Sequence, residues 1–169
     1  NFLIDQYIMN GGKVLWFIDP IFVNTDTVNA TNKLKQDFIP IPYELNLDEL
    51  FFKYGFRVEP NIILDYECSA IPLFSGYSGN TPQFEPKKWY FHPLIAPDSR
   101  HPIVRNLDRI SVFYPATIDT IKTKTEVSKT ILLSSSAHSR TLTSPSPINF
   151  EMVRQTITPE QFNRPAQPI

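Results

Sequence analysis

The segment FLIDQYIMNGGKVLWFIDP, residues 2–20, determines the fold that the sequence predicts. Its apolar residues first recur at helical spacing, over residues 2–9, which predicts a helix with one face toward a core. The glycine pair 11–12 follows, and a glycine just past a helix can adopt the left-handed conformation that ends it. Residues 14–18 are continuously apolar, as in a strand that a parallel sheet covers on both faces. Residues 19–20, Asp-Pro, close the predicted strand.

A second helix–glycine–strand unit follows later in the chain. Asn46 and Glu49 form a capping-box-like start, an apolar stripe continues to Tyr54, and Gly55 stops the helix. Residues 56–66 then predict a strand. Two such units predict an α/β fold, a partial Rossmann- or flavodoxin-like layered sheet that is mostly parallel, with long loops.

The remaining segments carry weaker patterns. Residues 24–42 are polar and predict a surface insertion that contacts a partner. We expect a long ordered loop over 67–88, with a short hairpin near Gly76–Asn80, and then strands near 88–95, 109–114 and 130–136. A short helix ending near Asn106, a pair of short strands over 117–129, a surface loop over 135–146 and a helical turn at 158–162 complete the prediction.

Domain organisation follows from composition along the chain. Residues 1–142 are assigned to an α/β domain truncated at its N-terminal side. Residues 143–169 are proline-rich and predict an extended segment that packs on this domain or leads to a further strand.

Composition excludes several function classes. A net charge of −1 and a pI near 6.3 give no electrostatic footprint for nucleic acid. No apolar run reaches the length of a membrane-spanning helix. The single Cys68 excludes an internal disulfide and a cysteine metal cluster. Neither a P-loop nor a dinucleotide-binding glycine motif occurs, so we expect no cofactor and no ATPase in this chain.

The order of these motifs resembles the extracytoplasmic domain of GldG-like gliding-motility ABC-transporter auxiliary proteins, of the ABC-type uncharacterised transport system family. The resemblance covers roughly the first seventy residues, with a weaker match at His101–Pro102–Ile103. The matching residues are Gly11, Gly12, Asp19, Pro20, Leu47, Leu50, Phe51, Tyr54, Gly55 and Asp65.

The resemblance implies a fold similar to that of class I glutamine amidotransferases. It also implies a preceding strand and helix, a membrane-anchored parent protein and a periplasmic location. The implied partners are ABC permease and ATPase subunits or envelope proteins. These motifs are structural, so they indicate the family rather than an activity.

The sequence offers three candidates for a catalytic or metal site. Cys68 lies between Glu67 and Ser69, without the small neighbours and following helix of a nucleophile elbow. Residues 75–79 are one residue short of the Gly-x-Ser-x-Gly elbow. His92, His101 and His138 lack the spacing of a helical zinc pair. We therefore expect no catalytic residue and no metal ligand.

Three aspartates are candidates for a ligand site. Asp19 and Asp65 both end predicted parallel strands, and Asp98 follows a further one, so their side chains could converge at one sheet edge. The alternative, which we favour, is that each carboxylate accepts hydrogen bonds from a nearby loop.

Aromatic residues fall where loops are expected. Exposed together they would form a protein-binding patch, whereas buried together they would pack under the long loop. The sequence leaves both open for Phe74, Tyr77, Phe84, Trp89 and Tyr90.

The sequence thus predicts a non-catalytic interaction domain of an ABC transport system linked to gliding motility, with possible contacts at Asp19, Asp65, Tyr77 and Trp89. The alternative is a domain that binds a small polar molecule or sugar near Asp19, Asp65 and the loop at Gly76–Gly79. A hydrolase or amidotransferase descendant comes third.

Overall fold

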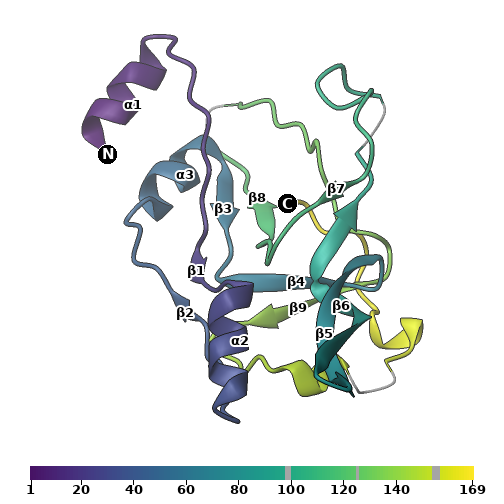
Figure 1. Ribbon diagram of the computed structural model, residues 1–169. Coiled ribbons are helices and arrows are strands. Elements are labelled where there is room, and N and C mark those ends of the chain that lie inside the picture. The colour runs from purple at the N-terminus through teal and green to yellow at the C-terminus, as the bar shows by residue number, and fades with distance from the viewer. Residues whose placement is uncertain (98–99, 125, 154–156) are drawn as a thin grey trace.

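The computed structural model describes residues 1–97, 100–124, 126–153 and 157–169. Within them the helices are short, and more of the chain lies in antiparallel strand pairs than in helices (Figure 1). The helices are α1 (Phe2–Met9), α2 (Thr25–Lys33), α3 (Asp48–Tyr54) and the 3-10 helices η1 (Phe150–Val153) and η2 (Pro159–Gln161). The strands are β1 (Ile21–Phe22), β2 (Ile41–Pro42), β3 (Phe56–Val58), β4 (Asn61–Asp65), β5 (Cys68–Ser78), β6 (Thr81–Ile95), β7 (Ile110–Ser111), β8 (Ile118–Thr120) and β9 (Ser139–Thr143).

The predicted parallel, Rossmann- or flavodoxin-like sheet is wrong. Each pair of named strands is antiparallel: β1 with β2, β3 with β8, β4 with β9, and β5 with β6, which also pairs with β7. The buried strand β4, predicted within 56–66, finds its partner in β9 rather than in residues 14–18. A buried apolar run specifies that a strand is covered, but it does not specify the direction of its neighbour.

Residues 14–18 are extended but belong to no strand. We call residues 13–18 the N-terminal arm; it connects α1 to β1 along one side of the molecule (Figure 1). Leu15 and Phe17 are 79% and 89% exposed, so the predicted burial of this segment is wrong. Trp16 packs inward, edge-on against Phe51 of α3 with 5.2 Å between ring centroids.

Both predicted glycine-terminated helices are present. Helix α1 ends before Gly11, and α3 ends at Gly55; both glycines have a φ of +84°. The left-handed backbone conformation at Gly55 favours glycine, whereas an added Cβ there would only displace the flexible end of the Lys129 side chain. An ion pair joins the two helices, with 2.7 Å between Nζ of Lys53 and Oδ1 of Asp5.

Several local predictions were wrong. The polar segment 24–42 contains α2, whose N-cap Asn24 accepts a hydrogen bond from the Thr27 amide, and whose Val28 is fully buried. The predicted loop 67–88 is most of the long β5–β6 hairpin. Residues 130–136 form no strand beyond a bridge at Ser134, whereas the predicted loop 135–146 supplies β9. Residues 101–106 form turns rather than a helix.

The core lies where β4, β6 and the C-terminal segment meet. Trp89 and Phe91 of β6 are fully buried, and the Trp89 ring lies 4.9 Å from that of Phe150 in η1. Phe162 packs against Tyr90 at 5.3 Å. The core cluster includes Ile62, Leu64, Ile71, Ile148, Phe150 and Phe162.

Candidate functional site

The predicted aspartate site does not assemble. Asp65 is fully buried at the end of β4. Its Oδ1 accepts from the amide of Glu67 at 2.8 Å and from Oγ of Ser136 at 2.6 Å, while Oδ2 accepts from the Ser136 amide at 2.6 Å. These bonds account for both oxygens, so Asp65 fixes a loop, which is the alternative that the sequence favoured. Asp98 lies outside the described residues.

Asp19 occupies a different place. It lines a shallow pocket of about 360 Å³ at the start of α2, together with Asn24, Thr25 and Asp26. The aromatic residues Phe113 and Tyr114 form the other wall. The structure therefore separates Asp19 from Asp65.

A buried polar network forms the floor beneath this pocket. Oγ1 of Thr25 lies 3.2 Å from Nε2 of His92 and 3.3 Å from the Tyr114 hydroxyl, which accepts from the Trp89 indole at 3.2 Å. Burial lowers the pKa of His92 to about 4 and raises that of Tyr114. The predicted contact residue Trp89 is thus part of the core, and its indole nitrogen anchors α2 through Tyr114.

Cys68 lies within strand β5 rather than on an elbow. Burial raises the pKa of its thiol to about 11, and the nearby Asp65 adds to this, although Lys88 opposes it. A thiol with that pKa is almost entirely protonated at neutral pH, which opposes nucleophilic chemistry.

The described histidines lie in separate environments: His92 is buried beside Thr25, and His101 accepts a hydrogen bond from the amide of Ile103. No group of three metal-ligating side chains occurs within the described ranges.

The aromatic residues divide into two groups. Trp89 and Tyr90 are buried, as the packing alternative expected. Phe74, Tyr77 and Phe84 lie together at the end of the β5–β6 hairpin and are 54%, 71% and 60% exposed. Ring centroids are 5.0 Å apart for Phe74 and Tyr77 and 6.2 Å apart for Phe74 and Phe84. We call these three residues the hairpin cluster.

The hairpin cluster opens onto a groove shared with α2. This groove has a volume of about 500 Å³. Phe74 and Phe84 line one side, and Asn29, Ala30 and Lys33 of α2 line the other. The sequence indicated both walls separately, as aromatics that are either exposed or buried and as a candidate contact insertion. It could not place them side by side, because no pattern linked α2 to the hairpin.

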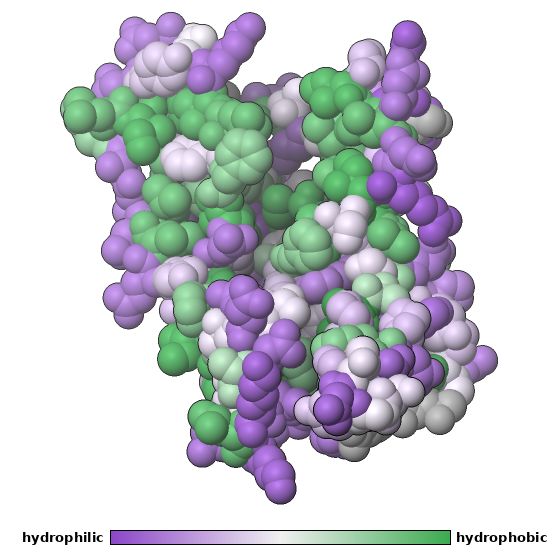
Figure 2. Space-filling view, in the orientation of Figure 1, coloured by the Kyte–Doolittle hydropathy of each residue, from purple (hydrophilic) through white to green (hydrophobic). Residues whose placement is uncertain are grey.

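A second apolar surface covers the N-terminal side of the molecule. Figure 2 shows apolar residues gathered over α1 and the arm. The exposed members are Phe2, Leu3, Tyr7, Met9, Val14, Leu15 and Phe17. Among the described residues, none of the helices has the length and apolar character needed to cross a bilayer.

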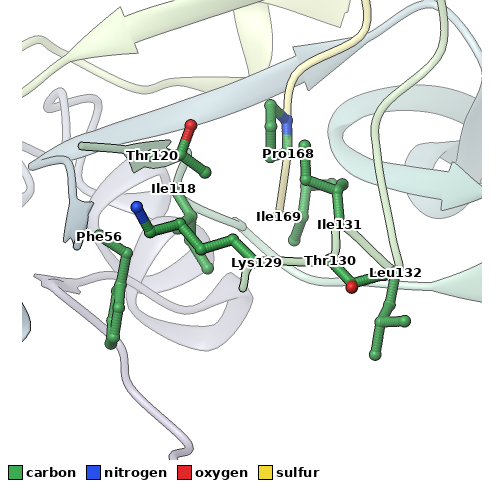
Figure 3. Close-up of a pocket in the computed structure, with 9 residues that line it drawn as sticks. All are labelled: Phe56, Ile118, Thr120, Lys129, Thr130, Ile131, Leu132, Pro168 and Ile169. Atoms are coloured by element: carbon green, nitrogen blue, oxygen red, sulfur yellow. The ribbon is translucent and has the colours of Figure 1, made fainter. Parts of the chain in front are cut away.

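A third feature is a pocket at the β3–β8 pair, shown in Figure 3. It is mainly apolar, with a volume of about 310 Å³, and Lys129 supplies its charged group. No sequence pattern indicated this pocket, because its walls come from four segments that are distant in the sequence.

Comparison with known proteins identifies the family. A protein of Borreliella burgdorferi (strain B31), described as uncharacterised, is 30% identical over 115 residues, which is 68% of this chain. The match spans only 19% of that relative's length. No solved structure matches the chain. The family model for the ABC-type uncharacterised transport system matches residues 1–169, so the chain belongs to this family of ABC transport auxiliary components.

Proposed function

We propose that this chain is a non-catalytic interaction domain through which an auxiliary protein engages the other subunits of an ABC-type transport system. The observation that carries the proposal is the groove between the hairpin cluster and α2. Its aromatic wall supplies a large contact area at low entropy cost, as in many protein interfaces. Lys33 and Asp26 provide charged groups around it that can fix the register of a bound segment.

The family membership indicates the class of partner. We infer that the groove receives a segment of the permease or ATPase, or of an envelope protein attached to them. We further propose that the domain is extracytoplasmic, that the parent protein is membrane-anchored and that the system serves gliding motility. These three statements rest on the motif resemblance described above.

Site-specific crosslinking tests the groove. A photoreactive amino acid replaces Tyr77 in the full-length protein, which is crosslinked in native membranes. The control position is Asp119, which is exposed on β8. We expect a transporter subunit to be captured from position 77 but not from 119, and the combined F74S and F84S substitutions to abolish capture. Efficient crosslinking at 77 to no transporter subunit would contradict the proposal.

Two further experiments test location and physiology. An S78C substitution at the hairpin end should react with a membrane-impermeant maleimide in intact cells. The native Cys68 should stay unlabelled, because its thiol is partly buried and protonated. Loss of the gene should arrest surface gliding without arresting growth; continued gliding would remove that part of the proposal.

The pocket at Asp19 supports a second candidate, the binding of a small polar molecule or sugar. Asp19, Asn24 and Asp26 offer hydrogen-bonding oxygens, and Phe113 offers a ring face for stacking. A thermal-shift panel of sugars should then give a shift that D19N removes. The absence of any shift would leave the interaction domain as the better reading.

A further inference from the structure

The pocket at the β3–β8 pair is framed by backbone hydrogen bonds between three segments that are distant in the sequence. The amide of Ile118 in β8 donates to the carbonyl of Pro168 at 3.0 Å. The amide of Ile169 donates to Leu133 at 3.2 Å, and that of Ile121 to Gly55 at 2.8 Å. Strand β8, residues 129–133 and the segment at 168–169 are therefore tied together around one hollow (Figure 3).

The lining of this pocket is mostly apolar, with a few polar side chains. Six of its members are apolar, and these form most of the exposed wall: Phe56, Ile118, Ile131, Leu132, Pro168 and Ile169. The polar members are Thr120, Thr130 and Lys129, and no acidic side chain of the described residues lines the pocket. The acidic residue of β8 is Asp119, and its Oδ2 lies 3.4 Å from Nη2 of Arg57. The lining thus carries one positive charge.

Lys129 is exposed, and its amine lies beside Gly55 and the carbonyl of Ile121. Its stem crosses Gly55 so closely that an added Cβ there would lie 2.6 Å from Nζ. Nζ donates to the carbonyl of Ile121 at 2.5 Å, which leaves further N–H donors for a ligand. In Figure 3 the amine lies on the side of Phe56 and Thr120, while Ile131 and Ile169 stand on the opposite side. One end of the pocket is therefore cationic and the other apolar.

We propose that this pocket binds a single-chain amphiphile with an anionic end group, with the acid against Lys129 and the acyl chain along Ile131 and Ile169. A charge-assisted hydrogen bond to the Lys129 ammonium orients the acid, and removal of the chain from water supplies the remaining affinity. The volume of about 310 Å³ lies at the lower end for small-molecule sites, which suits one short chain. The proposal is independent of the partner groove.

Head-group selectivity tests the charge. Decanoate, decyltrimethylammonium and decyl maltoside, which carry the same chain, are titrated calorimetrically into the protein below their micelle concentrations. We expect decanoate to bind most tightly. K129Q should weaken decanoate about tenfold or more and leave decyl maltoside unchanged, because only the acid uses the ammonium. K87Q, on β6, is the matched control and should change neither. Decyl phosphate in a parallel titration separates a carboxylate from a phosphate source.

Methyl NMR tests the position without a variant. Isoleucine methyl signals of Ile118, Ile131 and Ile169 should shift on addition of decanoate, while those of Ile62 and Ile63 in β4 should not. An I118W substitution should fill the hollow and abolish binding, with its melting temperature as the check on folding. Equal affinity for the three head groups, or shifts confined to other methyls, would overturn the proposal even if I118W failed to fold.

Discussion

Asp65 shows how one carboxylate organises a loop. Its oxygens accept three hydrogen bonds from Glu67 and Ser136 inside a fully buried site. D65N would place an amide NH₂ opposite at least one of these donors, so we expect it to lower the free energy of unfolding by about 1–3 kcal/mol. D119N, at an exposed site, should change it by less than about 0.5 kcal/mol. Urea unfolding measures both, and equal stabilities would show that the three bonds contribute nothing.

His92 makes stability depend on pH. Its pKa is about 4 in the folded chain against 6.5 for the free side chain, so the unfolded state binds the extra proton between these values. Stability should therefore be complete above about pH 6.5 and decrease as the pH falls toward 4, by roughly 3 kcal/mol in total. The free energy of unfolding, measured across this pH window, should decrease with falling pH more steeply for the native chain than for H92Q.

At the scale of the element, the N-terminal arm predicts an alternating response to substitution. Leu15 and Phe17 are exposed and Trp16 packs on Phe51. L15K and F17K should leave the free energy of unfolding within about 0.5 kcal/mol of the native value. W16A should lower it by about 1–2 kcal/mol through the lost ring contact and buried area. A large loss in F17K would mean that the arm is covered in solution.

The same elements show what the sequence could and could not predict. Helix α3 was predictable because its apolar stripe and Gly55 lie within one local segment. The predicted cap at Asn46 is wrong, since the N-cap is Leu47 and no side chain caps the helix. The N-terminal arm has an equally strong pattern, a continuous apolar run. Such a run indicates only that a strand would be stable if other elements covered it. Helix α2 was missed because Val28 is its sole buried residue among polar neighbours. Its position depends on Thr25 meeting His92 and Tyr114, which are distant in the sequence.

At the scale of the whole molecule, the C-terminal segment contributes to the core. Phe162 packs against Tyr66 and Tyr90, with centroids 5.9 and 5.3 Å away. F162A should lower the free energy of unfolding by about 3–5 kcal/mol, since it leaves a cavity between β4 and β6. Thermal or urea unfolding measures this. F113A, at an exposed ring, is the control and should cost much less.

Long-range pairing also limited the prediction of the candidate site. The aromatic residues of the hairpin cluster were recognisable by type, and Tyr77 is one of the contacts that the sequence predicts. Their exposure depends on β5 and β6 pairing along almost their whole length, which four prolines argued against. No sequence pattern predicted the pocket at Lys129, because the pocket forms only when residues 168–169 lie against β8.

Those prolines have a consequence for the hairpin itself. Pro72 of β5 stands directly opposite Pro86 of β6, and Pro82 lies opposite Tyr77 near the turn. A proline offers no amide hydrogen to an incoming strand, so a further strand could not form an unbroken ladder of hydrogen bonds along either strand of the hairpin. The chain can therefore expose the three rings of the hairpin cluster to water, while the prolines disfavour the addition of further strands to the hairpin.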